Sequence, residues 1–106
     1  MIENQNNVIK YNINFSKKSD MIYISHLDLM MLFRRAIRRA KLPFVLSNGF
    51  TKRVKISMPK ALKLGIESDN ESMVLCLKKY LQEKHIMDSI NSQLPEGIKI
   101  FKVIRK

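Results

Sequence analysis

Apolar residues recur with two different periods along this chain, and the order of those periods is the strongest constraint on its fold. Residues 8–15 alternate between apolar and polar side chains, which predicts a strand with one solvent-facing side. Apolar residues of segment 26–40 recur at helical spacing, and Ser25 followed by Asp28 is typical of a helix N-cap. The helix is expected to end before Pro43.

A long loop is expected after the first helix, and part of it, residues 54–58, alternates like an edge strand. Two strands are expected after this loop. Segments 65–68 and 72–77 flank the polar residues 69–71 and are expected to pair as a hairpin.

A second amphipathic helix is expected over residues 79–94, followed by Pro95, Gly97 and a last strand. The resulting order is strand, helix, two strands, helix, strand. It predicts an α+β fold of the ferredoxin-like βαββαβ type, a sandwich whose two helices cover one face of an antiparallel sheet. We expect residues 1–106 to form a single domain, with residues 1–7 flexible.

Basic residues dominate the middle of the chain. The formal net charge is +11, and no acidic residue lies between Asp28 and Glu67. The basic residues of that stretch are Arg34, Arg35, Arg38, Arg39, Lys41, Lys52, Arg53, Lys55, Lys60 and Lys63. Because so dense a positive charge raises the local concentration of polyanions, a phosphate-rich partner such as RNA is expected.

Four of these arginines share one face of the predicted first helix. At about 100° per residue, Arg34, Arg35, Arg38 and Arg39 occupy an arc of about 140° opposite the apolar residues. A guanidinium group is planar and matches two phosphate oxygens at once. The alternative interpretation is a solvated charged face that binds nothing.

The loop after this helix adds candidate contacts. Phe50 lies among basic residues and is a candidate for stacking on an unpaired base, whereas the alternative is that it fills the core. The predicted nucleic-acid-binding residues are Arg34, Arg35, Arg38, Arg39, Lys41, Phe50, Lys52, Arg53 and Lys55.

His26 is the residue that most invites a catalytic interpretation. It is expected at the first helical turn, near Tyr23, and histidine titrates in the range needed for acid–base catalysis. Its place on the apolar side of the helix favours a packed, hydrogen-bonded structural histidine instead. A metal-independent endoribonuclease that uses His26 with Tyr23 is therefore the weaker alternative, and the glycine-rich loop typical of nucleases with this fold is missing.

No metal or cofactor is expected. The two histidines and the single cysteine show no metal-ligand spacing, and Cys76 lies in an apolar segment that predicts a buried strand. No apolar run approaches the roughly 20 residues that span a bilayer, and no secretory signal is evident, so a cytoplasmic location is expected.

Several segments resemble the bacterial radical-SAM-linked protein family. The most specific is the Ser25-His26-Leu27-Asp28 helix start, and the arginine-rich helix continues the match. The segments that match are 23–30, 33–43, 47–50, 55–57, 64–68 and 94–97. The resemblance implies an accessory domain of unknown function, found fused to radical-SAM enzymes or encoded beside them, with a role in RNA modification or processing.

One departure from that family bears on the site. Its members commonly carry Asn-Pro-His-Pro where residues 51–54 here are Thr-Lys-Arg-Val. This places in doubt any site that joins His26 to a loop histidine, and it favours phosphate contacts by Lys52 and Arg53. With one cysteine, the chain also lacks the three that hold a radical-SAM cluster, so the resemblance implies a partner of such an enzyme.

These observations lead to one expected function and two alternatives. We expect an RNA-binding domain that has no catalytic activity of its own and positions RNA for a separate enzyme. The alternatives are the ribonuclease described above and a protein-interaction module whose basic face docks a radical-SAM enzyme or a ribosomal protein.

Overall fold

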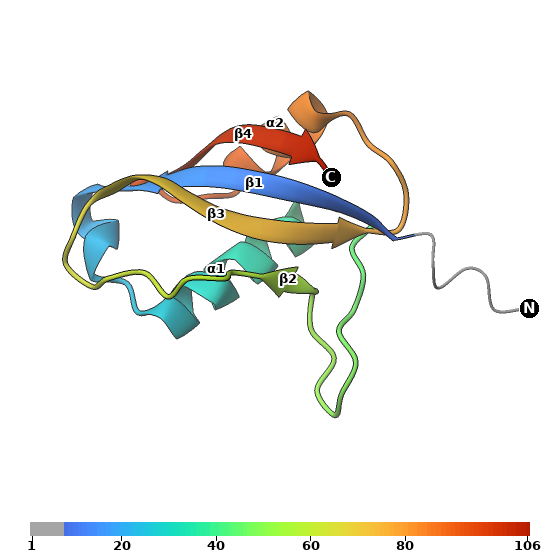
Figure 1. Cartoon of the computed structure of the whole chain (residues 1–106), viewed down its shortest axis with the longest axis horizontal. Coiled ribbons are helices and arrows are strands. Elements are labelled where there is room, and N and C mark those ends of the chain that lie inside the picture. Colours follow the sequence, from blue (N-terminus) through green and yellow to red (C-terminus); the bar gives the residue numbers. More distant parts are fainter. Residues whose placement is uncertain (1–7) are drawn as a thin grey trace, which may run out of the picture.

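The computed structural model describes residues 8–106, so the expectation for residues 1–7 lies outside the described part. A four-stranded sheet with strand order β2-β3-β1-β4 forms one layer, and two helices form the other (Figure 1). In chain order the elements are β1 (Ile9–Lys17), the 3-10 helix η2 (Ser19–Tyr23), α1 (His26–Arg39), β2 (Ile56–Ser57), β3 (Ser68–Leu77), α2 (Glu83–Asn91) and β4 (Ile98–Arg105).

The sheet confirms the predicted fold class. Neighbouring strands are antiparallel throughout, and β1 lies between β3 and β4 in the centre of the sheet. This arrangement is compatible with the ferredoxin-like sandwich that the order of the predicted strands and helices indicates. Because β1 is central and Phe33 of α1 packs on Phe15 of β1, the basic helix is held against the middle of the sheet.

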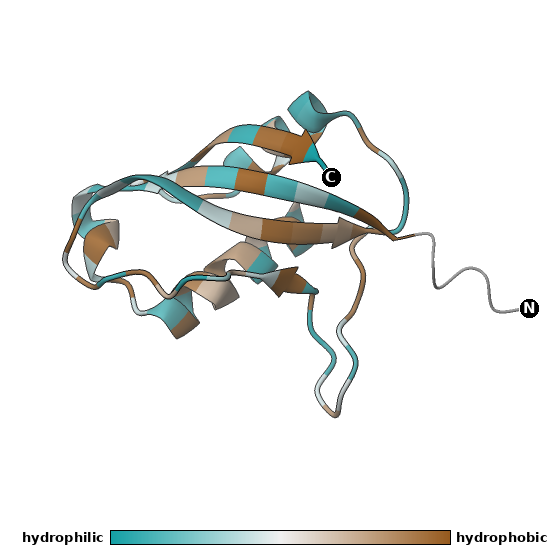
Figure 2. Cartoon of the chain, in the orientation of Figure 1, coloured by the Kyte–Doolittle hydropathy of each residue, from teal (hydrophilic) through white to brown (hydrophobic). Residues whose placement is uncertain are grey.

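The hydrophobic core lies between the sheet and the helices. Apolar and polar residues alternate along β1, as Figure 2 shows, and Tyr11, Ile13 and Phe15 on its apolar side are fully buried. Phe15 of β1 meets Phe33 of α1 edge to face, with ring centroids 4.9 Å apart. The other large side chains of this core that are fully buried are Leu29, Ile37, Met73, Leu75, Leu77, Ile86 and Ile90.

The predicted hairpin at residues 65–77 is wrong. Residues 68–77 form one continuous strand, β3, in which Glu71 pairs with Phe15 and Ser68 pairs with Lys17. Asp69 and Asn70 are exposed at this end of the sheet, so their polarity reflects solvent and not a turn.

The other differences from the predicted elements are changes of length. The edge strand over 54–58 shrinks to β2, with Val54 in an isolated bridge to Leu46. The second helix begins at Glu83 and not at residue 79, because the segment before it is tied to β1. There the buried Tyr11 hydroxyl donates to the Leu81 carbonyl at 2.8 Å and accepts from the Leu81 N–H at 2.9 Å.

Strand β1 extends two residues beyond the predicted end at Phe15. The stem of Lys17 is buried, and its Nζ donates to the Lys63 carbonyl at 2.7 Å. A long lysine side chain can bury its methylenes while its amine reaches a polar partner, which an alternation pattern does not anticipate.

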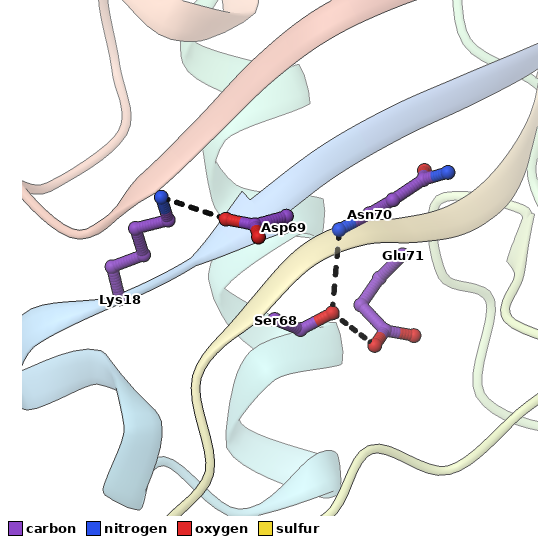
Figure 3. A network of polar contacts seen from close by, with 5 residues as sticks. All are labelled: Lys18, Ser68, Asp69, Asn70 and Glu71. Atoms are coloured by element: carbon purple, nitrogen blue, oxygen red, sulfur yellow. Dashed lines mark hydrogen bonds and ion pairs between the residues drawn. The ribbon is translucent and has the colours of Figure 1, made fainter.

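Lys18 and the start of β3 form a polar network at one end of the sheet (Figure 3). Lys18 Nζ lies 2.8 Å from an Asp69 carboxylate oxygen. The Ser68 hydroxyl donates to the Glu71 carboxylate and accepts from the Asn70 N–H. Of these contacts, the Lys18–Asp69 pair joins the start of β3 to the residue that follows β1, and the other two lie within β3.

The Lys18–Asp69 pair predicts a pH-dependent contribution to stability. The hydrogen bond and the charge of Lys18 lower the pKa of Asp69, and the same contacts with Asp69 raise the pKa of Lys18. The contribution is therefore complete between the unfolded-chain values of about 3.9 for Asp and about 10.4 for Lys. It is lost as the pH falls through the Asp69 pKa, and as the pH rises through the Lys18 pKa. We expect Lys18→Gln to raise the pKa of Asp69 in a carboxyl NMR titration.

Lys84→Gln, which removes the exposed Lys84–Asp88 pair instead, is the control and should leave the Asp69 titration where it was. An Asp69 titration that does not move in Lys18→Gln would contradict the pairing.

Candidate nucleic-acid interface

Helix α1 carries the core on one side and the arginines on the other. Its N-cap is confirmed, since the Ser25 hydroxyl accepts the Asp28 N–H at 3.1 Å. The buried residues of the helix are Leu29, Phe33, Ala36 and Ile37. Because these side chains fix the rotation of the helix, the positions between them are directed away from the core.

The four predicted arginines do not have the same environment. Arg35, Arg38 and Arg39 are exposed, whereas Arg34 is half-buried and its Nε donates to the Val54 carbonyl at 3.2 Å. Arg34 therefore ties the loop before β2 to the middle of α1. Burial lowers the pKa of the Arg34 guanidinium, and the nearby charge of Arg53 lowers it further.

Side chains of α1 and of the loop before β2 line an open hollow of about 430 Å³. The residues that line it are Leu27, Met31, Arg34, Arg35, Arg38 and Arg53. We refer to this site as the arginine hollow. It brings together four of the predicted nucleic-acid-binding residues, three from the helix and one from a loop about 20 residues further along the chain.

The remaining predicted basic residues lie outside this hollow. Arg39 lines a second hollow of about 360 Å³, which it shares with Arg35 and the segment after α2. Lys41, Lys52 and Lys55 are exposed and line neither. The predicted basic residues are thus divided between the arginine hollow, the second hollow and exposed positions that line neither.

Phe50 lies in the loop between α1 and β2 that projects from the molecule in Figure 1. Its side chain is fully exposed, at 108% of the reference accessibility. The alternative in which Phe50 fills the core is therefore wrong. Its stacking on a base remains a prediction.

The arginines have no carboxylate partners within residues 8–106. The ion pairs in this part of the chain join Lys18 to Asp69 and Lys84 to Asp88, both away from the arginine hollow. The contacts that the arginines do make are with uncharged groups: Arg34 with a carbonyl, and Arg38 with the ring of Phe44 at 5.0 Å. No carboxylate of residues 8–106 therefore forms an ion pair with the arginines of the hollow.

His26 and Tyr23 are not part of this arrangement. His26 is half-buried at the start of α1, and its Nδ1 is buried without a hydrogen-bond partner among the described residues. The expectation of a hydrogen-bonded histidine is thus wrong for that nitrogen. Tyr23 is 67% exposed, and neither residue lines the arginine hollow.

Cysteine and metal ligands add nothing to the site. Cys76 is buried in β3, as expected. In the part of the chain that the structure describes, no three His, Cys, Asp or Glu residues come together in a way that could hold a metal ion. None of the helices in residues 8–106 is long and apolar enough to cross a membrane.

Sequence reasoning missed the apolar part of the lining, Leu27 and Met31, which we call the floor of the hollow. The signal was available in their spacing, because residues 27, 31, 34 and 38 follow one another at intervals of three or four and so form one stripe on a helix. The arginine side of the helix therefore carries apolar as well as charged side chains.

Comparison with known proteins identifies a family and no close relative. A family model described as "Uncharacterized protein conserved in bacteria (DUF2344)" matches residues 10–105, nearly the whole chain. No curated protein and no solved structure gives a match.

Proposed function

We propose that this chain, which belongs to that family of uncharacterized bacterial proteins, binds RNA through the arginine hollow and the adjoining basic loop. The observation that carries the proposal is the convergence of Arg35, Arg38 and Arg53 with Arg34 on one hollow without a carboxylate partner in residues 8–106. Guanidinium groups placed in this way suit phosphate oxygens, which they bind through paired hydrogen bonds.

Electrostatics favours a polyanion as the ligand. The charge of Arg53 lowers the pKa of Arg34, so the two cations repel each other across the hollow. A protein that keeps like charges close together without compensation loses stability, and a bound polyanion removes that repulsion. The electrostatic free energy of the hollow is therefore lower with bound phosphates than without them.

We further propose that the protein positions RNA for a separate enzyme. The hollow contains cationic and apolar side chains and no general base, so it suits binding better than cleavage. The resemblance of the Ser25-His26-Leu27-Asp28 helix start to radical-SAM-linked proteins supports a radical-SAM enzyme as that partner, and such a role places the protein in the cytoplasm.

A salt titration tests the proposal. We expect a fluorescently labelled single-stranded RNA to bind more weakly as salt rises, with the logarithm of the association constant falling by about 2 to 3 for each tenfold rise in salt. This slope corresponds to three or four neutralised phosphates, each of which contributes about 0.7. Fluorescence anisotropy between about 50 and about 200 mM salt measures this slope. The RNA recovered after incubation should be intact, which separates binding from cleavage by His26.

No binding at the lowest salt, or an affinity that salt does not change, would contradict the proposal. Selective capture of a protein that survives nuclease treatment would instead favour the interaction-module alternative.

A further inference from the structure

We infer that the arginine hollow holds one unstacked nucleotide of an RNA strand, with its base on the apolar floor and its flanking phosphates on the surrounding guanidinium groups. The inference rests on the proposed function and adds a preference for single-stranded over paired RNA. A free nucleotide carries the same chemistry. We assign the site to a strand because exposed basic residues continue beyond the hollow to Arg39, Lys52 and Lys55.

The floor of the hollow requires a ligand with apolar surface. Leu27 is 67% exposed and Met31 is 51% exposed, and they are neighbours at positions i and i+4 of α1. Phosphate groups gain nothing from such a strip. A base has a flat π-face on each side, and covering the two side chains with one face removes apolar surface from water.

The size of the hollow fits a nucleotide better than a protein segment. Its volume of about 430 Å³ lies in the range of small-molecule sites, which hold about 300 to 1,000 Å³. A stable protein partner would need a far larger buried area, of at least about 1,000 Å² in total. A base that is paired inside a duplex cannot reach the floor, because its faces are covered by its neighbours in the stack.

Two of the four arginines that line the hollow already have side-chain contacts within the protein. Arg34 is fixed by its hydrogen bond to the Val54 carbonyl, and Arg38 lies over the ring of Phe44. Arginine planes stack on bases as well as bind phosphates. Because these side chains are already ordered, a base that enters between them loses less binding energy to side-chain ordering.

A double-mutant cycle between protein and RNA tests the inference. The protein change is Leu27→Gln with Met31→Gln, which keeps helix propensity and alters two exposed side chains, so the fold is expected to survive. The RNA change replaces every nucleotide of a short strand by an abasic ribose phosphate. Ile104→Gln is the matched control, since Ile104 is 45% exposed on β4, opposite Asn12.

We expect the wild-type protein to bind the normal strand about tenfold more tightly than either the abasic strand or a duplex of the same sequence. The Leu27→Gln, Met31→Gln protein should bind all three with the same weak affinity and keep the wild-type salt slope, because its cations are intact. Ile104→Gln should behave like the wild type.

The outcomes that overturn the inference differ from those that overturn the proposed function. Equal affinity of the wild type for normal and abasic strands, with a steep salt slope, would leave RNA binding in place and exclude the base site. Absence of binding to any RNA would remove both. Displacement of the strand by AMP, or by an acidic amphipathic peptide, at concentrations similar to that of the strand itself would assign the hollow to that ligand and overturn ours.

Discussion

Replacing Arg35, Arg38 and Arg53 by glutamine is expected to lower the affinity for single-stranded RNA about 100-fold at low salt. Each substitution removes one cation from the arginine hollow and leaves a shorter, uncharged polar side chain in its place. Arg35, Arg38 and Arg53 are exposed and form no ion pair within residues 8–106, so we expect the fold to survive, although Arg38 loses its contact with the ring of Phe44. The salt slope should also fall by about 1.4, since the two phosphates that flank the bound nucleotide lose their guanidinium contacts, at about 0.7 for each phosphate.

A second triple variant separates this site from the effect of net charge. Lys10, Lys99 and Lys102 are exposed on β1 and β4. Their replacement by glutamine removes an equal number of positive charges, but from strands and not from the arginine hollow. We expect this variant to lose less than about threefold in affinity, because scattered surface charge acts only through screened long-range attraction. Equal losses in the two variants would show that net charge, and not the arginine hollow, determines binding.

Arg34 is left out of the triple variant because its role is mixed. Its Nε donates to the Val54 carbonyl, so a substitution would release the loop that carries Arg53 as well as remove a charge. A loss of RNA affinity in such a variant would not distinguish contact with phosphate from misplacement of Arg53.

The parts of the fold that follow from local patterns could be predicted from the sequence. The alternation in β1, the Ser25 cap and the opposed faces of α1 all depend on residues within a few positions of one another. The hairpin was wrong because Asp69 and Asn70 have the composition of a turn. Their strand conformation depends instead on distant partners, such as the hydrogen bond of 2.9 Å between the Asn14 and Asn70 side chains.

The candidate site shows the same division. The arginine face of α1 is a local property and could be predicted from helical spacing. The arginine hollow is not, because it exists only where the Val54 carbonyl meets Arg34 and brings Arg53 beside the helix. The exposure of Leu27 and Met31, by contrast, is a local property, because both residues lie in the arginine stripe and outside the buried face of α1.

Gly97 illustrates a position whose role changes once the fold is known. Its place after Pro95 suggested the end of the second helix, yet α2 ends at Asn91 and Gly97 immediately precedes β4. Its φ is +102°, and its carbonyl accepts the Lys18 N–H at 2.7 Å. A Cβ added here would lie 2.6 Å from the Lys18 carbonyl oxygen and 2.8 Å from Met21 Cγ. The connection between β1 and η2 therefore packs directly on the Gly97 backbone.

Gly97→Ala is accordingly expected to destabilise the fold by about 4 kcal/mol, the sum of backbone strain at positive φ and of overpacking against a main-chain oxygen that cannot rotate away. Gly49→Ala separates the two causes, because Gly49 has a φ of +123° but a Cβ there meets nothing within 4 Å. That control should cost only about 1 kcal/mol, from strain alone in an exposed loop. Urea unfolding followed by circular dichroism measures both values. Equal losses of stability would show that backbone strain suffices and that β1, η2 and β4 do not pack as closely as described. A much larger loss for Gly97→Ala would confirm that a side chain at this position collides with Lys18 and Met21, in the segment that connects β1 to α1.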